Sequence, residues 1–138
     1  MHPEELLERG VERLRPFFDG LGFRYAFLET VEGSGGVAAR GEFRRGRCFV
    51  GLHVRGALGI VEYGLDGTPY VPVRHRDVVA RLGVEREAMF PGFGDDPLTN
   101  FDLLLSDLER FVRPLLADEE TLRALLATPT PERSGHLP

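Results

Sequence analysis

The 138-residue sequence contains one cysteine, no lysine, no glutamine and no tryptophan. The single cysteine, Cys48, excludes an intramolecular disulfide and a zinc site built from several cysteines, which is typical of a reducing compartment. All 17 basic residues are arginine. We attribute this skew to codon usage in a GC-rich bacterial genome rather than to selection for guanidinium groups, so arginine clusters are weak functional signals in this chain.

Long apolar runs are also missing. None approaches the roughly 20 residues that a membrane span needs, and the opening stretch MHPEELLERG carries acids where a signal peptide needs a basic start. We therefore expect a cytoplasmic protein with no membrane segment. Residues 1–36 hold 4 Arg and 7 acids, residues 37–86 hold 9 and 5, and residues 87–138 hold 4 and 10. This uneven charge favours a protein partner, whereas a nucleic-acid partner would require a strong basic patch.

The hydrophobic pattern predicts one α+β domain over residues 1–127. An apolar arc predicts an N-terminal helix from Pro3, which Pro16 should kink or interrupt. Between residues 23 and 73, four or five short alternating segments with tight turns predict an antiparallel β-meander, in which TPYVPV can only be an edge strand. C-terminal helices are expected at 75–83, 98–112 and 118–127, packed with the N-terminal helix on the sheet. Residues 128–138 are predicted to be a disordered tail.

The stretch FPGFGDDPLTNF contains two adjacent aspartates before an apolar helix. Asp96 can accept the unpaired amides of a first helical turn, and Pro97 at the first helical position needs no partner. Asp95 lies at the positive end of the same helix dipole. We interpret this trio as a structural helix start; the alternative is a metal or acid/base role.

The following helix has one apolar side chain outside its core arc. Leu103 lies nearly opposite the centre of that arc, beyond the polar Asp102 and Asp107. One explanation is contact with the short C-terminal helix, and the other is a partner-binding surface with a polar rim.

The strand CFVGLHVR separates two kinds of side chain. Cys48 falls on the apolar face, so we expect a buried thiol with a raised pKa. His53 and Arg55 lie on the opposite face. If no helix covers that face, they would form a cationic patch suited to a carboxylate or phosphate; the alternative is an ordinary solvated face.

No sequence pattern identifies catalytic residues, cofactor-binding residues or metal ligands. The sequence has no His pair at i, i+4, no phosphate-binding loop between strand and helix, and no G-x-S-x-G elbow. The segments FPGFGDDPLTNFDLLLSDLERF, LHVRGALGIVEYG and HRDVVARLG, within about residues 40–112, resemble a group of small, functionally uncharacterised bacterial proteins with an F/YPGF-x-DDPL-x-x-F segment. The resemblance implies an intact domain and no catalytic role. Because members of such groups often lie near polymorphic toxin genes, it also suggests immunity-type binding.

Together these features favour a non-enzymatic, immunity-like or chaperone-like domain that binds another protein. The alternative is a small enzyme or anionic-ligand binder with a site near His53, Arg55 and Asp95. The first strand, FRYAFLETVE, has no proline to protect its edge. An exposed edge and the leucine at position 103 predict association with a partner or with a second copy, most simply as a homodimer.

Overall fold

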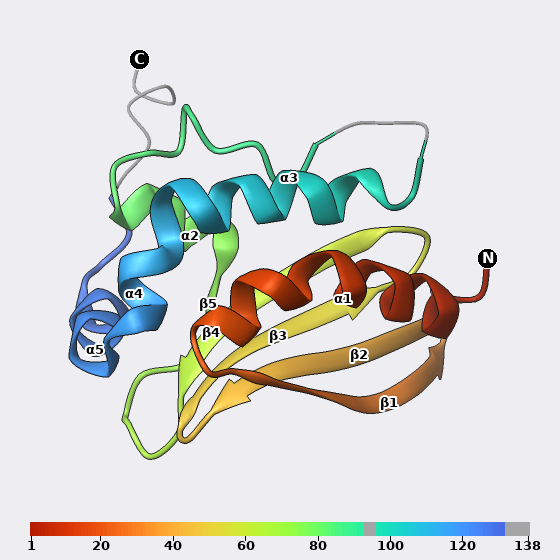
Figure 1. The fold of residues 1–138 in the computed structure, drawn as a ribbon, viewed down its shortest axis with the longest axis horizontal. Coiled ribbons are helices and arrows are strands. Elements are labelled where there is room, and N and C mark those ends of the chain that lie inside the picture. Colours follow the sequence, from red (N-terminus) through yellow and green to blue (C-terminus); the bar gives the residue numbers. More distant parts are fainter. Residues whose placement is uncertain (93–95, 132–138) are drawn as a thin grey trace.

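The chain folds as a five-stranded antiparallel sheet with helices on one face (Figure 1). This computed structural model describes residues 1–92 and 96–131. The strands are neighbours in space in the order in which they occur in the sequence, so the predicted α+β meander with N-terminal and C-terminal helices is confirmed. None of the described helices is long and apolar enough to cross a membrane. The elements are α1 (Pro3–Gly20), β1 (Arg24–Gly33), β2 (Gly36–Arg45), β3 (Cys48–Val54), β4 (Leu58–Leu65), β5 (Val73–Arg74), α2 (His75–Arg81), α3 (Thr99–Asp107), η1 (Leu108–Val112), α4 (Arg113–Ala117) and α5 (Glu119–Ala127).

Helix α1 runs without interruption through Pro16. Proline removes only the amide that would bond to the carbonyl of Glu12, and both residues lie on the exposed side of the helix, where water can bond to that carbonyl. On the other side, Leu7, Leu14 and Phe18 are completely buried. Burial of this apolar face holds the helix together across the proline.

The C-terminal helix accommodates its proline differently. The helix expected at 98–112 was predicted to end before Arg113 and Pro114. The structure instead has a π-helical segment, η1, immediately before Arg113, and the helix continues as α4. A π-turn is wider than an α-turn and is a common way for a helix to absorb a local defect. The helical path therefore continues to Ala117.

Register and burial separate the two faces of the sheet. On β3, Cys48 and Val54 belong to the core beneath the helices, with at most 2% of each residue exposed. Phe49, Gly51 and His53 alternate with the core residues and are half-buried on the other face. The predicted facing of this strand is confirmed, and no described helix covers its second face. We call this second face the open face.

A close contact joins α1 to α3. A β-carbon at Gly10 would lie 2.2 Å from the ring of Phe101, which is fully buried. Glycine at this position lets the two helices approach until the aromatic ring lies directly on the backbone of α1. The contact ties the N-terminal helix to the C-terminal helical layer.

The sheet has two short or irregular edges. β5 forms one edge, as predicted, but it contains only Val73 and Arg74, so only the last residue of the predicted strand TPYVPV belongs to the sheet. β1 forms the other edge, as predicted, but the expectation that nothing guards it is wrong: a register shift between Phe27 and Glu29 leaves Leu28 as a β-bulge. A bulge disrupts the regular row of backbone groups that a second strand would need.

Candidate functional site

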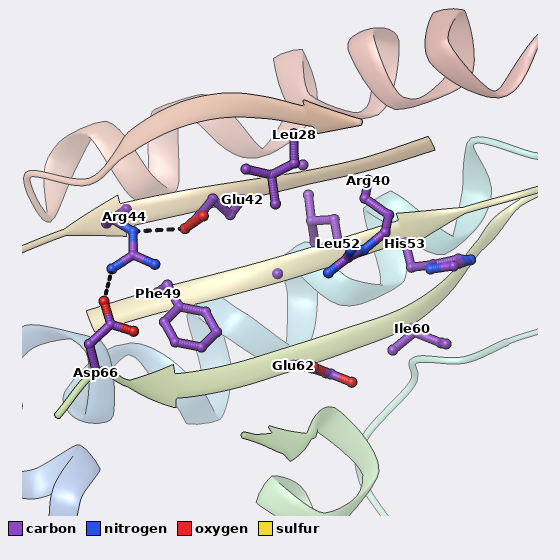
Figure 2. Close-up of a pocket in the computed structure, with 12 residues that line it drawn as sticks. Leu28, Arg40, Glu42, Arg44, Phe49, Leu52, His53, Ile60, Glu62 and Asp66 are labelled. Carbon is purple, nitrogen blue, oxygen red and sulfur yellow. Dashed lines mark hydrogen bonds and ion pairs between the residues drawn. The ribbon is translucent and has the colours of Figure 1, made fainter. Parts of the chain in front are cut away.

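The open face contains a hollow with a volume of about 200 Å³ (Figure 2). Its wall is formed by β2, β3 and β4, so rigid elements position every side chain around its centre. The charged and central lining residues are Arg40, Glu42, Arg44, Gly51, His53, Glu62 and Asp66. Leu28, Phe49 and Ile60 contribute apolar surface. We refer to this depression as the hollow.

The sheet register explains why the face is hollowed. Glu42 on β2, Gly51 on β3 and Glu62 on β4 lie in one cross-strand row. Two strand spacings place the α-carbons of the two glutamates roughly 9.5 Å apart. Gly51, which lies between them, has no side chain. The depression is therefore flanked by two carboxylates.

Aromatic and aliphatic side chains form the rest of the surface. The Phe49 ring covers Gly64 of β4, where a β-carbon would lie 2.2 Å from the ring. The guanidinium carbon of Arg44 lies 5.1 Å from the centre of the same ring. At the β1 side, Leu28 is 45% exposed because the bulge turns it outward over the sheet. The hollow is thus bordered by solvent-accessible apolar groups as well as charges.

Ion pairs neutralise both arginines of the hollow. Arg44 bonds to Glu42, with 2.8 Å between Nε and Oε2, and also to Asp66 (Figure 2). Arg40 bonds to Glu29 at 2.8 Å. The face carries mixed charge.

His53 lies where the sequence placed it, but Arg55 does not join it in the hollow. Burial, followed by the nearby Arg55 and Arg40, lowers the pKa of His53 below its ordinary value, so the imidazole is neutral at neutral pH. Arg55 is exposed beyond the end of β3, and its guanidinium lies against Gly35. Arg55 is therefore not among the residues that line the hollow.

A second polar cluster lies inside the protein. The Tyr63 hydroxyl is 2.7 Å from Nδ1 of His75, and Nε2 of His75 is 2.9 Å from Oδ2 of Asp107. The Asp107 carboxylate also accepts hydrogen bonds from the amides of Met89 and Phe90, at 2.8 and 3.0 Å. The network connects β4, α2, α3 and the segment before Pro91. Sequence reasoning missed it.

This network corrects the prediction for Asp107, which was expected on a partner surface. Asp107 is 0% exposed and His75 is 1% exposed. Burial favours the neutral acid, but the hydrogen bonds from His75, Met89 and Phe90 outweigh it and lower the pKa of Asp107. Burial, followed by the Asp107 charge, raises the pKa of Tyr63 well above its ordinary value.

The buried network resembles a proton relay, but its geometry indicates a structural role. Both ring nitrogens of His75 have intramolecular partners, and none of the three side chains is accessible to a substrate. In the described part of the chain, no group of three or more His, Cys, Asp or Glu is arranged to hold a metal ion. The cluster therefore serves the fold.

The remaining predicted surface residues are separated from each other. Asp102 is exposed and pairs with Arg13 of α1. Leu103 is half-buried, and its Cδ1 lies 2.2 Å from the position of a β-carbon at Gly92. Leu103 is therefore covered by the segment before α3 rather than by the last helix, and it is not an exposed anchor.

The helix-start prediction holds in part. The Asp96 carboxylate accepts a hydrogen bond from the Leu98 amide at 2.8 Å, and its carbonyl accepts one from the Thr99 amide at 3.0 Å. Asp96 thus organises a turn through Pro97, and the regular helix begins two residues later than expected, at Thr99. Asp95 lies outside the described residues.

Cys48 provides a direct test of the assigned faces. Burial raises the pKa of its thiol to about 11, and only 2% of the residue is exposed. We expect a thiol reagent to label the native protein slowly and the denatured protein rapidly. Rapid labelling of the native protein would place Cys48 on the accessible side of β3 and reverse the two faces.

Comparisons with family models, with curated proteins and with solved structures give no match. The resemblance carried by the FPGFGDDPLTNF segment therefore remains a prediction, and the arrangement of residues on the open face is the basis for a functional argument.

Proposed function

We propose that this protein is a non-enzymatic binding domain that recognises another protein through the open face of its sheet. The observation that carries the proposal is the combination of partly exposed apolar groups with charges on a rigid, uncovered surface. Leu28, Phe49 and Ile60 border the hollow, and ion-paired arginines and acids surround them. Protein interfaces commonly combine apolar and aromatic contacts with a polar rim.

The alternative of an anionic-ligand site near His53, Arg55 and Asp95 has less support. Arg55 does not line the hollow, and His53 has a lowered pKa. The third residue of that site lies outside the described residues. An enzyme site would require several polar side chains that converge on one reacting group, and the polar groups of the hollow bond mainly to each other.

The experiment is affinity capture from the source cell, followed by binding measurements with the purified captured protein. Leu28→Glu places a charge in the apolar border and should weaken binding at least about tenfold, or ~1.4 kcal/mol. Val71→Glu is the matched control because Val71 is 76% exposed in the segment between β4 and β5. It should leave the affinity unchanged.

Equal binding by the wild type and by Leu28→Glu would exclude the open face as the recognition surface. If the wild type captures no protein more strongly than Leu28→Glu does, that result also contradicts the proposed function.

A further inference from the structure

Gly51 occupies the centre of the hollow, and the surrounding fold does not require a glycine there. Its φ angle is not positive, and a β-carbon built on it would meet no atom within 4 Å. A glycine inside a strand weakens that strand, and one common reason for its presence is the close approach of a ligand or of another chain. The missing side chain keeps the hollow open.

Three glycines in the interior of the strands have an internal reason. A β-carbon at Gly41 would lie 2.3 Å from the hydroxyl of Tyr25, and one at Gly64 would overlap the ring of Phe49. Gly59 is the extra residue where the register between β3 and β4 shifts. These contacts explain glycine by packing or by a bulge, and they do not apply at the centre of the hollow.

The size of the hollow indicates the kind of group that enters it. Its volume of about 200 Å³ is below the roughly 300–1,000 Å³ of pockets that bury drug-sized molecules. It also opens onto a broad sheet face. A single side chain projecting from a docked protein fits this geometry better than a free cofactor does.

The ion pairs indicate the charge of that group. Glu42 and Asp66 both bind Arg44. None of the ion pairs among the described residues includes Glu62. Glu62 is therefore the carboxylate of the hollow that is available to an incoming cation.

The local balance of charge agrees with this assignment. The residues that line the hollow carry two guanidinium groups and three carboxylates, a net charge of −1 (2 − 3). His53 adds no positive charge at neutral pH because its pKa is lowered. Arg74 is the register neighbour of Glu62 on β5, but no ion pair joins them, so its guanidinium competes with an incoming cation without occupying the site.

We propose that the hollow receives the ammonium or guanidinium group of a lysine or arginine side chain of the partner protein, which lies over Gly51 and pairs with Glu62. This inference rests on the proposed function and adds the chemistry of the contact. It predicts a basic residue at the centre of the partner's binding surface.

A titration tests the pocket without the partner. The probe is arginine amide, added at millimolar concentrations to the isotopically labelled full chain, with sodium acetate at equal ionic strength as the anionic control. We expect amide resonances of Phe49, Gly51, His53 and Glu62 to shift with arginine amide and not with acetate. Localised shifts with acetate instead, or no localised shift with arginine amide, would overturn the inference.

Variants separate the role of the site from a structural role. Gly51→Val should abolish the shifts while Tm stays unchanged or rises, because the fold has room for the side chain. Glu62→Gln should also abolish them, and Arg74→Ala should strengthen them by removing the competing guanidinium. Glu109→Gln, at an exposed acid on η1, is the control and should retain them. A lower Tm for Gly51→Val would show that the glycine serves the fold and would contradict the inference.

The complex with the captured partner distinguishes this inference from the proposed function. Glu62→Gln should raise the Kd about tenfold, as expected for the loss of one interfacial charge pair. If Leu28→Glu weakens binding and Glu62→Gln does not, the open face remains the recognition surface, and the inference that a basic side chain of the partner pairs with Glu62 is wrong. If Leu28→Glu leaves the affinity for the partner unchanged, the proposed function itself is wrong.

Discussion

Asp107→Ala is expected to lower the free energy of unfolding by about 3–5 kcal/mol, because several polar groups lose their hydrogen-bond acceptor inside the protein. The substitution removes the acceptor from the buried His75, from the buried amide of Phe90 and from the part-buried amide of Met89. Each unpaired buried polar group costs about 1–3 kcal/mol. Urea unfolding of the two proteins at neutral pH measures the difference.

Asp102→Ala is the matched control because Asp102 lies on the same helix, is exposed and pairs with Arg13. Such surface pairs contribute about 0–1 kcal/mol. Similar losses for the two alanine variants would show that Asp107 is not the acceptor that holds the segment before Pro91 against α3.

The same carboxylate makes stability depend on pH. Because hydrogen bonds outweigh burial and lower the pKa of Asp107, the folded protein holds the ionised form more tightly than the unfolded chain does. The resulting stability is present above the unfolded pKa, about 3.9, and is lost as pH falls through the lower folded pKa. The difference in unfolding free energy between the wild type and Asp107→Ala should therefore shrink below about pH 4. Urea titrations at stepped pH measure it, and a constant difference at about pH 3 would contradict this assignment.

Phe101→Ala should destabilise the protein by a similar amount, about 3–5 kcal/mol, because it removes a fully buried ring between α1 and α3. The effect of Gly10→Ala depends on whether that ring is present. With Phe101 in place, the new methyl group lies 2.2 Å from the ring and should cost about 1–3 kcal/mol through overpacking. With alanine at position 101, the clash is gone and the better helix propensity should stabilise α1 by about 1 kcal/mol.

A double-mutant cycle measures this change of sign, with the four unfolding free energies determined by urea titration. Gly20→Ala is the control, since a β-carbon at Gly20 would meet no atom within 4 Å, and its effect should be the same in both backgrounds. If Gly10→Ala had the same effect with and without the ring, the close approach of the two helices would be wrong.

The sheet could be predicted because its signals are local. Alternation along β3 assigned Cys48 and His53 to opposite faces, and turn residues marked the ends of the strands. The prolines of TPYVPV limited the last strand for a reason that is visible in the sequence, the missing backbone donor. The bulge at Leu28 had no comparable signal, because the segment around it consists of ordinary strand residues.

The buried network could not be predicted because its members are far apart in the sequence. His75 and Asp107 are 32 residues apart, and Asp107 lies just outside the apolar arc of its helix, where an aspartate is usually solvated. Its burial depends on the backbone of Met89 and Phe90 crossing that side of α3. The mixed charge of the open face was missed for a related reason. Sequence reasoning considered one strand at a time, whereas Glu29, which pairs with Arg40, lies on the neighbouring strand β1, and Asp66, which pairs with Arg44, lies in a turn.

The neighbour-by-neighbour order of the strands has a consequence for synthesis on the ribosome. Each strand from β2 to β5 pairs with the one made just before it, so the sheet can grow while the chain is still being extended. The surface of α1 at Gly10, in contrast, is covered by the ring of Phe101, which is synthesised 91 residues later (101 − 10). Until α3 has emerged, a nascent chain presents a nearly finished sheet with uncovered apolar surface, the kind of intermediate that aggregates or engages chaperones. Any pause in translation before α3 has emerged from the ribosome would prolong this vulnerable state.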